Sequence, residues 1–144
     1  MGKKRIIRKS GSSIDQGLKS RSLSRIGKRN LVSGTLHIQA TYNNTKVLLA
    51  DKEGNTVLWS SSGALGFSGA KKGTPFAAAK VGELIGEKAA MIGLKDVDVI
   101  IRGVGAGRES ALRGFVSKGI EVNRIADDTP VPYNGPRQRK ARRI

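Results

Sequence analysis

Residues 97–126 read VDVIIRGVGAGRESALRGFVSKGIEVNRIA and decide the fold. Two runs rich in β-branched residues, 97–101 and 121–126, enclose a segment of helical periodicity over 109–118. That helix is expected to bury Leu112, Phe115 and Val116. A strand, a helix and a second strand in this order form a crossover between parallel strands. The stretch therefore predicts an α/β domain.

A longer helix is predicted upstream, over residues 75–92. Thr74 suits the N-cap, Pro75 the first helical position and Gly93 the C-cap. The apolar positions expected to be buried are Ala77, Val81, Leu84, Ile85, Met91 and Ile92. A stripe of small residues also follows the helix, namely Ala79, Gly82, Gly86, Ala89 and Gly93. Tight packing of the helix on a sheet would explain this stripe, and docking of an RNA backbone or a partner protein is the alternative.

The segment before these helices predicts three antiparallel strands. Residues 34–42, GTLHIQATY, place His37 on one face and the residues expected to be buried on the other, namely Leu36, Ile38, Ala40 and Tyr42. Apolar runs at 46–51 and 56–60 follow turn residues and complete a meander. We therefore expect one domain with a mixed five-stranded sheet, the meander first and then β-α-β-α-β, and with helices packed over it.

The positive charge is concentrated at the two ends of the chain. The sequence has 27 Lys and Arg against 11 Asp and Glu, for a net charge of +16. Residues 1–30 carry +9 and residues 137–144 carry +5, whereas residues 31–136 carry only +2. Such ends cannot offset their ordering entropy, so we expect them to be disordered when free and to order on a polyanion. The expected division is a basic N-terminal extension (1–31), an α/β globular domain (32–128) and a basic C-terminal RNA-binding tail (129–144).

A membrane partner is not expected. An N-terminus rich in Ser, Arg and Lys is also typical of organellar transit peptides, but this one has no clear amphipathic apolar stripe. No apolar run approaches the roughly 18 residues of a membrane-spanning helix.

Two glycine-rich loops are candidate phosphate cradles. Residues 102–109, RGVGAGRE, join a strand to a helix, but their evenly spaced glycines do not match the dinucleotide-binding pattern G-x-G-x-x-G. Residues 60–73, SSSGALGFSGAKKG, do not match the Walker A pattern. Each loop still combines glycines, cations and a helix start, which suits a phosphate group. For the second loop, a flexible solvated connection is the alternative.

The sequence contains no recognisable set of catalytic residues. The chain contains no Cys, and His37 is its single imidazole. The pairs Asp96/Asp98 and Asp127/Asp128 do not present convergent carboxylates. We therefore expect no enzyme activity, cofactor, metal site or small-molecule substrate, and a partner-facing or solvated role for His37.

The aromatic residues are few, and most are expected in the core. Phe67 and Tyr133 are the exceptions, because they fall in loops. Without an RNP-type aromatic signature, base stacking is not expected to be the main mode of binding.

Four separated segments resemble one known family. They are Leu36-His37-Ile38 to Asn43-Asn44-Thr45, Gly66-Phe67 to Gly73-Thr74-Pro75-Phe76-Ala77-Ala78, Arg102-Gly103 to Gly107-Arg108-Glu109-Ser110, and Asp128-Thr129-Pro130-Val131-Pro132 to Asn134-Gly135 with its basic end. In this order, over about residues 32–144, they are similar to the eleventh protein of the small ribosomal subunit in the bacterial numbering.

The resemblance implies a structural constituent of the small ribosomal subunit, with a ribonuclease-H-like mixed sheet and no nuclease activity. It also implies binding to small-subunit rRNA in the platform, near the mRNA exit and the exit-site tRNA. Neighbouring platform proteins would be its protein partners, and mRNA near the exit channel a further one.

Two motifs depart from the pattern of that family. Val104 and Ala106 stand where its glycine loop usually has prolines, so we expect a less rigid loop. The C-terminal motif Tyr133-Asn134-Gly135-Pro136-Arg137-Gln138 stands where the family usually has His-Asn-Gly-Cys-Arg-Pro, so no role of that His or Cys is carried over.

We expect the chain to bind rRNA through its tails, its glycine loops and the cations beside them. The candidate residues are Lys3, Lys4, Arg5, Arg8, Lys9, Lys28, Arg29, Asn43, Asn44, Lys71, Lys72, Thr74, Arg102, Gly103, Gly105, Gly107, Arg108, Arg113, Asn134, Gly135, Arg137, Arg139, Lys140, Arg142 and Arg143. The expected location is the cytoplasmic ribosome, with an organellar ribosome as the alternative. Two other functions stay open: a nucleotide-binding enzyme that uses the loop Gly103–Gly107, and a nonspecific DNA-binding protein.

Overall fold

A mixed sheet of five strands forms the centre of residues 30–139, which are the residues that the computed structural model describes. The strand order is β3-β2-β1-β4-β5. The strands are β1 (Ser33–Ala40), β2 (Thr45–Ala50), β3 (Thr56–Ser61), β4 (Asp96–Arg102) and β5 (Glu121–Asp127). The single-domain α/β fold predicted from the sequence is therefore confirmed, including the order of its elements.

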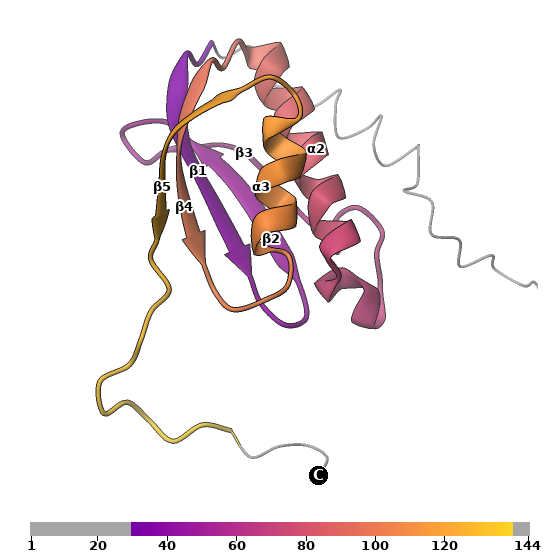
Figure 1. The fold of residues 1–144 in the computed structure, drawn as a ribbon, viewed down its shortest axis with the longest axis vertical. Coiled ribbons are helices and arrows are strands. Elements are labelled where there is room, and N and C mark those ends of the chain that lie inside the picture. The colour runs from indigo at the N-terminus through magenta and orange to yellow at the C-terminus, as the bar shows by residue number, and fades with distance from the viewer. Residues whose placement is uncertain (1–29, 140–144) are drawn as a thin grey trace, which may run out of the picture.

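The directions of the strands bring several loops to one edge of the sheet. β1 pairs antiparallel with β2, and β2 with β3, which makes the predicted meander. β1 pairs parallel with β4, and β4 with β5. The carboxyl ends of β1, β4 and β5 therefore lie at the same edge, at the lower end of the sheet in Figure 1.

Both α-helices of the described residues cover the same face of the sheet (Figure 1). α2 (Pro75–Ile92) follows a short 3-10 helix, η1 (Gly69–Gly73), and α3 (Arg108–Val116) follows β4. The predicted caps of α2 are confirmed: the Thr74 hydroxyl accepts a hydrogen bond from the amide of Ala77 at 3.3 Å, and Gly93 is left-handed with φ 90°. Within residues 30–139, no helix combines the length and apolarity needed to cross a membrane.

The core lies between the helices and the covered face of the sheet. Leu36 and Ile38 of β1, Val81 and Ile85 of α2, and Phe115 of α3 are all at most 1% exposed. These positions follow the period of two in the strands and the period of 3.6 in the helices. The alternation predicted in the first strand is thus confirmed for Leu36, Ile38 and Ala40.

Several residues predicted to be buried are exposed instead. Tyr42 is 79% exposed because β1 ends at Ala40 and the chain then turns. Met91 is 65% exposed, and Val116 is exposed as the last residue of α3, while Leu112 is only partly buried. The expectation that most aromatic residues lie in the core is also wrong. Phe115 is fully buried, but the largely exposed aromatic side chains are Tyr42, Trp59, Phe76 and Tyr133.

The stripe of small residues on α2 faces α3. A Cβ added at Gly82 would lie 2.1 Å from the carbonyl oxygen of Ala111, and one at Gly86 would lie 2.9 Å from that of Phe115. Gly114 of α3 reciprocates, because a Cβ there would lie 2.4 Å from the carbonyl oxygen of Ala79. The interpretation as helix-on-sheet packing is therefore wrong at Gly82 and Gly86. A neighbouring helix occupies the space that was alternatively assigned to RNA or to a partner protein.

Replacing Gly82 by Ala tests this helix contact. Alanine has the better helix propensity by about 1 kcal/mol, so an isolated helix would gain stability. In the folded domain we expect a loss of about 1–3 kcal/mol, because the added methyl group overlaps the backbone of α3. Urea denaturation of both proteins measures the difference.

Gly63→Ala is the matched control for this substitution. A Cβ at Gly63 meets nothing closer than 3.6 Å, so its stability should stay within about 0.5 kcal/mol of the unsubstituted protein. A Gly82→Ala protein as stable as this control would contradict the helix contact.

Candidate nucleic-acid interface

Three loops meet where β1 and β4 end, and we call this region the loop end. They are the β1–β2 turn (residues 41–44), η1 with Lys71 and Lys72, and the loop of residues 103–107 between β4 and α3. Both α2 and α3 also begin here, so the positive ends of two helix dipoles point the same way (Figure 1). The sequence-predicted glycine loops are therefore brought together in space.

The glycines of the loop 103–107 lie against the β1–β2 turn of the same chain. A Cβ at Gly103 would lie 2.1 Å from the carbonyl oxygen of Ala40, and one at Gly105 would lie 2.3 Å from that of Thr41. The amide of Gly105 donates a hydrogen bond to the Ala40 carbonyl oxygen at 2.9 Å. The missing side chains at these two positions thus serve contact between two backbone segments.

Gly107 and Gly73 are equally close to neighbouring atoms, whereas a Cβ at Gly69 would meet nothing within 4 Å. A Cβ at Gly107 would lie 2.3 Å from the buried hydroxyl oxygen of Thr45. A Cβ at Gly73, the last residue of η1, would lie 2.2 Å from the carbonyl oxygen of Tyr42. Gly73 therefore fixes the lysine-bearing η1 against the β1–β2 turn.

The β1–β2 turn is held by its own hydrogen bonds. The amide of Thr41 donates to the carbonyl oxygen of Asn44 at 2.8 Å, and the Thr41 hydroxyl donates to the same oxygen at 3.0 Å. The amide of Asn44 donates to the Thr41 hydroxyl at 3.1 Å. Asn43 is exposed at the tip of this turn, so its amide group is open to a partner.

Lys71 and Lys72 lie in a segment without acidic residues. Lys71 is exposed, Lys72 is half-buried, and η1 contains no Asp or Glu. Thr74, another candidate contact, is already engaged: its hydroxyl donates to the carbonyl oxygen of Lys71 at 2.7 Å while it caps α2. The two lysines are therefore the open groups of this segment.

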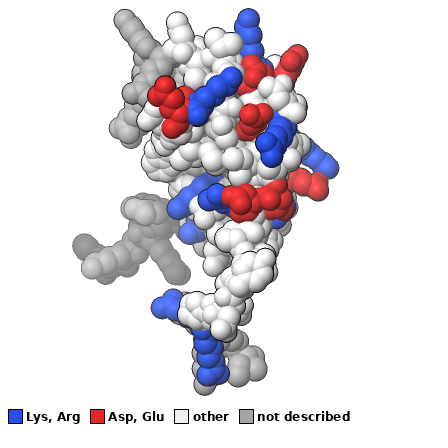
Figure 2. Space-filling model, turned by 90° about the vertical axis from the view of Figure 1, so that its left-hand side faces the viewer, with Lys and Arg blue, Asp and Glu red and all other residues white. Residues whose placement is uncertain are grey.

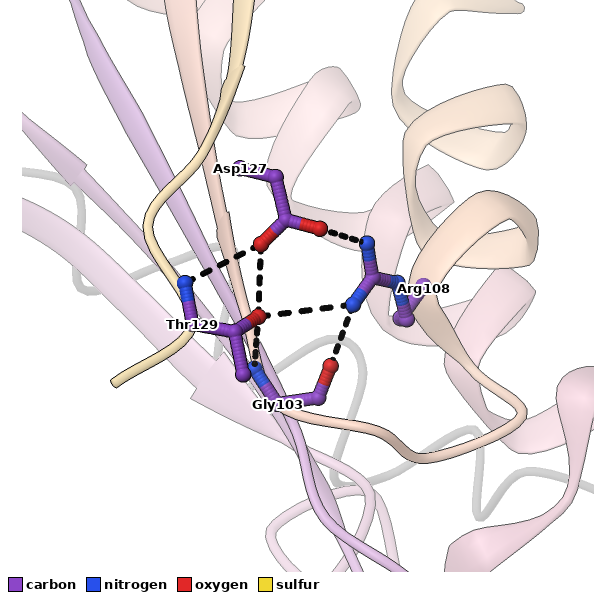
Figure 3. A network of polar contacts seen from close by, with 4 residues as sticks. All are labelled: Gly103, Arg108, Asp127 and Thr129. Atoms are coloured by element: carbon purple, nitrogen blue, oxygen red, sulfur yellow. Dashed lines mark hydrogen bonds and ion pairs between the residues drawn. The ribbon is translucent and has the colours of Figure 1, made fainter. Parts of the chain in front are cut away.

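Arg108 lies at the centre of a polar network, shown in Figure 3, that we call the Arg108 clamp. Its guanidinium donates to the carbonyl oxygen of Gly103 and to the Asp127 carboxylate, with which it forms an ion pair. The Thr129 hydroxyl donates to the same carboxylate and accepts from the amide of Gly103 at 3.2 Å. The clamp joins the end of β4, the start of α3 and the segment that follows β5.

The pKa of the Asp127 carboxyl depends on the hydrogen bonds of this network. Hydrogen bonds from the Thr129 hydroxyl, from the Arg108 guanidinium and from the Thr129 amide lower its pKa from 3.8 to about 2. A carboxylate that accepts several hydrogen bonds is stabilised in its ionised form. At neutral pH this negative charge compensates the positive charge of Arg108.

Two further candidate arginines form exposed ion pairs. Arg102 pairs with Asp128 beside the clamp, and Arg113 pairs with Glu109 at 3.0 Å one turn along α3. Exposed pairs of this kind contribute little, typically about 0–1 kcal/mol. Either guanidinium can therefore exchange its carboxylate for a phosphate at low cost.

Residues 128–139 extend from β5 away from the domain (Figure 1). Residues 130–139 are exposed, and Arg137 and Arg139 supply the positive charge toward the end of the described segment (Figure 2). Asn134 bends the chain here with a φ of 54°, and a Cβ at Gly135 would lie 2.9 Å from the Pro132 side chain. Because residues 130–139 are exposed, their polar groups are accessible to a binding partner.

The remaining candidate residues lie outside the described residues. They are Lys3, Lys4, Arg5, Arg8, Lys9, Lys28, Arg29, Lys140, Arg142 and Arg143. Conversely, two residues of the clamp, Asp127 and Thr129, were not predicted as part of the site. No local pattern identifies them, because their partner Arg108 lies about 20 residues earlier in the chain.

His37 and the acidic side chains are the groups that catalysis or metal binding would require. The pKa of His37 is lowered by partial burial and by the nearby positive charge of Arg102. Within residues 30–139, no group of three or more His, Cys, Asp or Glu side chains is placed to hold a metal ion.

Comparison with protein-family models matches residues 34–143 to the family described as Ribosomal protein S11. The match covers about three quarters of the chain. It includes all five strands except the first residue of β1, the three loops of the loop end and the Arg108 clamp.

The clamp predicts how Asp127 titrates. The pKa of Asp127 is lower in the folded domain than in the unfolded chain. The clamp therefore stabilises the domain at pH values above about 3.8, and this contribution is lost as the pH falls toward 2. In Thr129→Val, which removes the side-chain hydrogen bond that lowers this pKa most, we expect the pKa of Asp127 to rise toward 3.8. NMR titration of the side-chain carboxyl carbon measures both values.

Asp51 is the internal control for this titration. Its pKa is lowered by hydrogen bonds from Asn55 in the β2–β3 turn, at the opposite end of the sheet. Thr129→Val should leave the titration of Asp51 unchanged. An Asp127 carboxyl that titrates near 3.8 in the unsubstituted protein would show that the clamp does not form.

Proposed function

The chain belongs to the ribosomal protein S11 family, and we propose that its loop end and C-terminal segment form one continuous surface for rRNA. Proteins of this family are structural components of the small ribosomal subunit that bind rRNA, so the chain acts in translation on the ribosome beside other ribosomal proteins. The proposal concerns which residues make the contact and how the fold presents them.

The distribution of paired and unpaired charges at the loop end supports the proposal most directly. The acids beside these loops, Asp127, Asp128 and Glu109, are each bound to an arginine of the same domain. Lys71 and Lys72 have no acid in their own segment, and Arg137 and Arg139 extend beyond the domain. The field at this end is therefore positive, as a phosphate backbone requires.

The candidate residues fall into two groups with different tasks. Lys71, Lys72, Arg137 and Arg139 are open to phosphates, and the exposed side chain of Asn43 can reach a sugar or base edge. Gly103, Gly105 and Gly107 act by allowing close packing of the loops. We assign Arg108 as a positioning residue, because its guanidinium is bound to groups of the protein itself.

The binding partners and location can be stated more finely within this proposal. We place the chain in the platform of the small subunit, near the mRNA exit and the exit-site tRNA, with platform proteins as neighbours and mRNA as a further contact. We assign it to cytoplasmic rather than organellar ribosomes and give it a structural role without enzyme activity. The basic segments 1–31 and 129–144 would act as RNA-binding arms of the globular domain 32–128.

The packing of the loop 103–107 disfavours a nucleotide-binding enzyme. In a dinucleotide-binding turn the glycines leave room for the pyrophosphate. Here the space beside Gly103 and Gly105 is filled by the carbonyl groups of Ala40 and Thr41. A nonspecific DNA-binding role has no separate observation in its favour.

Salt dependence tests the assignment of phosphate contacts. The logarithm of the affinity for small-subunit rRNA should fall linearly with the logarithm of the salt concentration. Replacing both Arg137 and Arg139 by Ala should reduce the slope by about 0.7–0.9 for each phosphate that is no longer neutralised. Fluorescence anisotropy with labelled rRNA at several salt concentrations measures the slope.

Lys52→Ala is the matched control for the arginine variants. Lys52 is an exposed cation in the β2–β3 turn, at the opposite end of the sheet. Its removal should leave the slope unchanged. A slope that responds equally to Lys52 and to the two arginines would mean that binding follows net charge and not the proposed surface.

Arg108→Gln separates a positioning role from a phosphate contact. The substitution breaks the clamp, so the C-terminal segment leaves the domain in a less defined direction and the affinity for rRNA falls. Because Arg108 neutralises no phosphate in this proposal, the salt slope should stay as in the unsubstituted protein. A slope reduced by about 0.7–0.9 would instead place Arg108 on a phosphate.

A further inference from the structure

The face of the sheet opposite the helices is not covered by any described helix (Figure 1), and we call it the open face. One row of side chains crosses all five strands on this face. The cross-strand register places these residues side by side: Trp59, Leu48, His37, Ile100 and Ala126. The row is a surface of apolar and imidazole groups that is continuous across the sheet.

Trp59 is the most prominent member of this row. Its side chain is 63% exposed, whereas Leu48, His37 and Ile100 are partly buried by their neighbours. A hollow over the neighbouring strands β2, β1 and β4 is lined by His37, Ile38, Gln39, Lys46, Leu48, Ile100 and Arg102. The exposed indole, whose cross-strand neighbour Leu48 lines this hollow, offers a face on which a planar group can stack.

Positive charges border the row on the side of the loop end. The adjacent row consists of Ser61, Lys46, Gln39 and Arg102, with Asp128 beside Arg102 after the end of β5, so it contains two cations and one acid. The row on the other side, Thr35, Asp98 and Arg124, is electrically balanced. Arg102 itself pairs with Asp128 in an exposed contact that a phosphate can replace. The charge on this face therefore increases toward the surface already assigned to rRNA.

We propose that the open face is a second RNA contact, at which an unpaired base stacks on Trp59 and the backbone of the same strand lies on Lys46 and Arg102. The inference rests on the proposed function, because it extends the loop-end surface over the sheet. Lys46 is on the strand next to Trp59, two residues along from its cross-strand neighbour Leu48, so the two positions are about 7–8 Å apart. Arg102 is two strands further, about 10 Å beyond Lys46. A single strand of RNA crossing the sheet can contact all three.

An RNA strand fits these groups better than a protein partner does. Stacking on an aromatic side chain together with cations along the backbone path is the usual way in which sheets bind single-stranded RNA. A protein interface would favour a larger apolar area with few charges at its centre. Here the hollow is lined by two cations, an imidazole and an amide beside its apolar residues.

Trp59 provides its own probe, because the chain contains a single Trp. In the free full-length protein the indole emission should be quenched readily by acrylamide. Saturating small-subunit rRNA should quench the emission and protect it from acrylamide, and so should an unstructured uridine decamer at low salt. An indole that is inaccessible in the free protein would overturn the proposal.

Substitutions then measure what stacking contributes. Trp59→Ala should weaken binding of the uridine decamer about 5- to 100-fold without changing the salt slope, since stacking carries no counterion release. Trp59→Phe should retain most of the affinity. Met91→Ala removes an exposed apolar side chain from α2, in the layer of helices, and should change neither affinity nor emission.

The outcomes distinguish failure of this inference from failure of the proposed function. If rRNA binds with the expected salt slope but the emission of Trp59 does not change, the open face is not an RNA contact, whereas the loop end remains one. If the emission changes only when other ribosomal proteins are added, a protein covers the face and the inference is wrong. If rRNA does not bind at all, both are wrong.

Discussion

Close approach of backbone to backbone at glycine positions is the constraint on which the rest of this structure depends. At the loop end, Gly103 and Gly105 bring the β4–α3 loop onto the β1–β2 turn, and a side chain at either position would overlap a carbonyl oxygen. Between the helices, Gly82 does the same for α2 and α3. Since the second contact fixes α3 over the sheet and the first fixes its leading loop, the positions of Arg108 and Arg113 follow from them, and Gly73 does the same for Lys71 and Lys72.

The charges near this end are divided between holding the domain together and binding a partner. Arg108 is bound to Asp127, Thr129 and Gly103, so its charge stabilises the exit of the C-terminal segment. Lys71 and Lys72 are in a segment that contains no acid. If all the cations contacted RNA, other interactions would have to orient the C-terminal segment. Here the Arg108–Asp127 ion pair and its hydrogen bonds provide that orientation together with the Arg102–Asp128 pair, and Lys71, Lys72, Arg137 and Arg139 are left for phosphates.

Local sequence was sufficient to predict the elements, but not their tertiary partners. The caps Thr74 and Gly93 and the alternation of Leu36 and Ile38 depend on a few neighbouring residues, and these predictions are confirmed. The stripe on α2 correctly indicated that something approaches closely, but such a stripe is the same whether a sheet or a helix faces it. Likewise, the positive charge of Arg108 was visible in the sequence, whereas its engagement by Asp127 depends on how β5 is placed. Charge patterns therefore predict the class of partner better than they predict which cations meet it.

The loop 103–107 shows how one ordering device can replace another. Prolines at positions such as Val104 and Ala106 would restrict the loop by reducing the conformational freedom of the unfolded chain. Here Val104 is exposed and makes no such restriction, yet the loop is attached at Gly103 by the Arg108 clamp and at Gly105 by the hydrogen bond to Ala40. These attachments act on the folded state alone. The free energy that orders the loop therefore depends on the clamp, which links the conformation of the loop to the placement of the C-terminal segment.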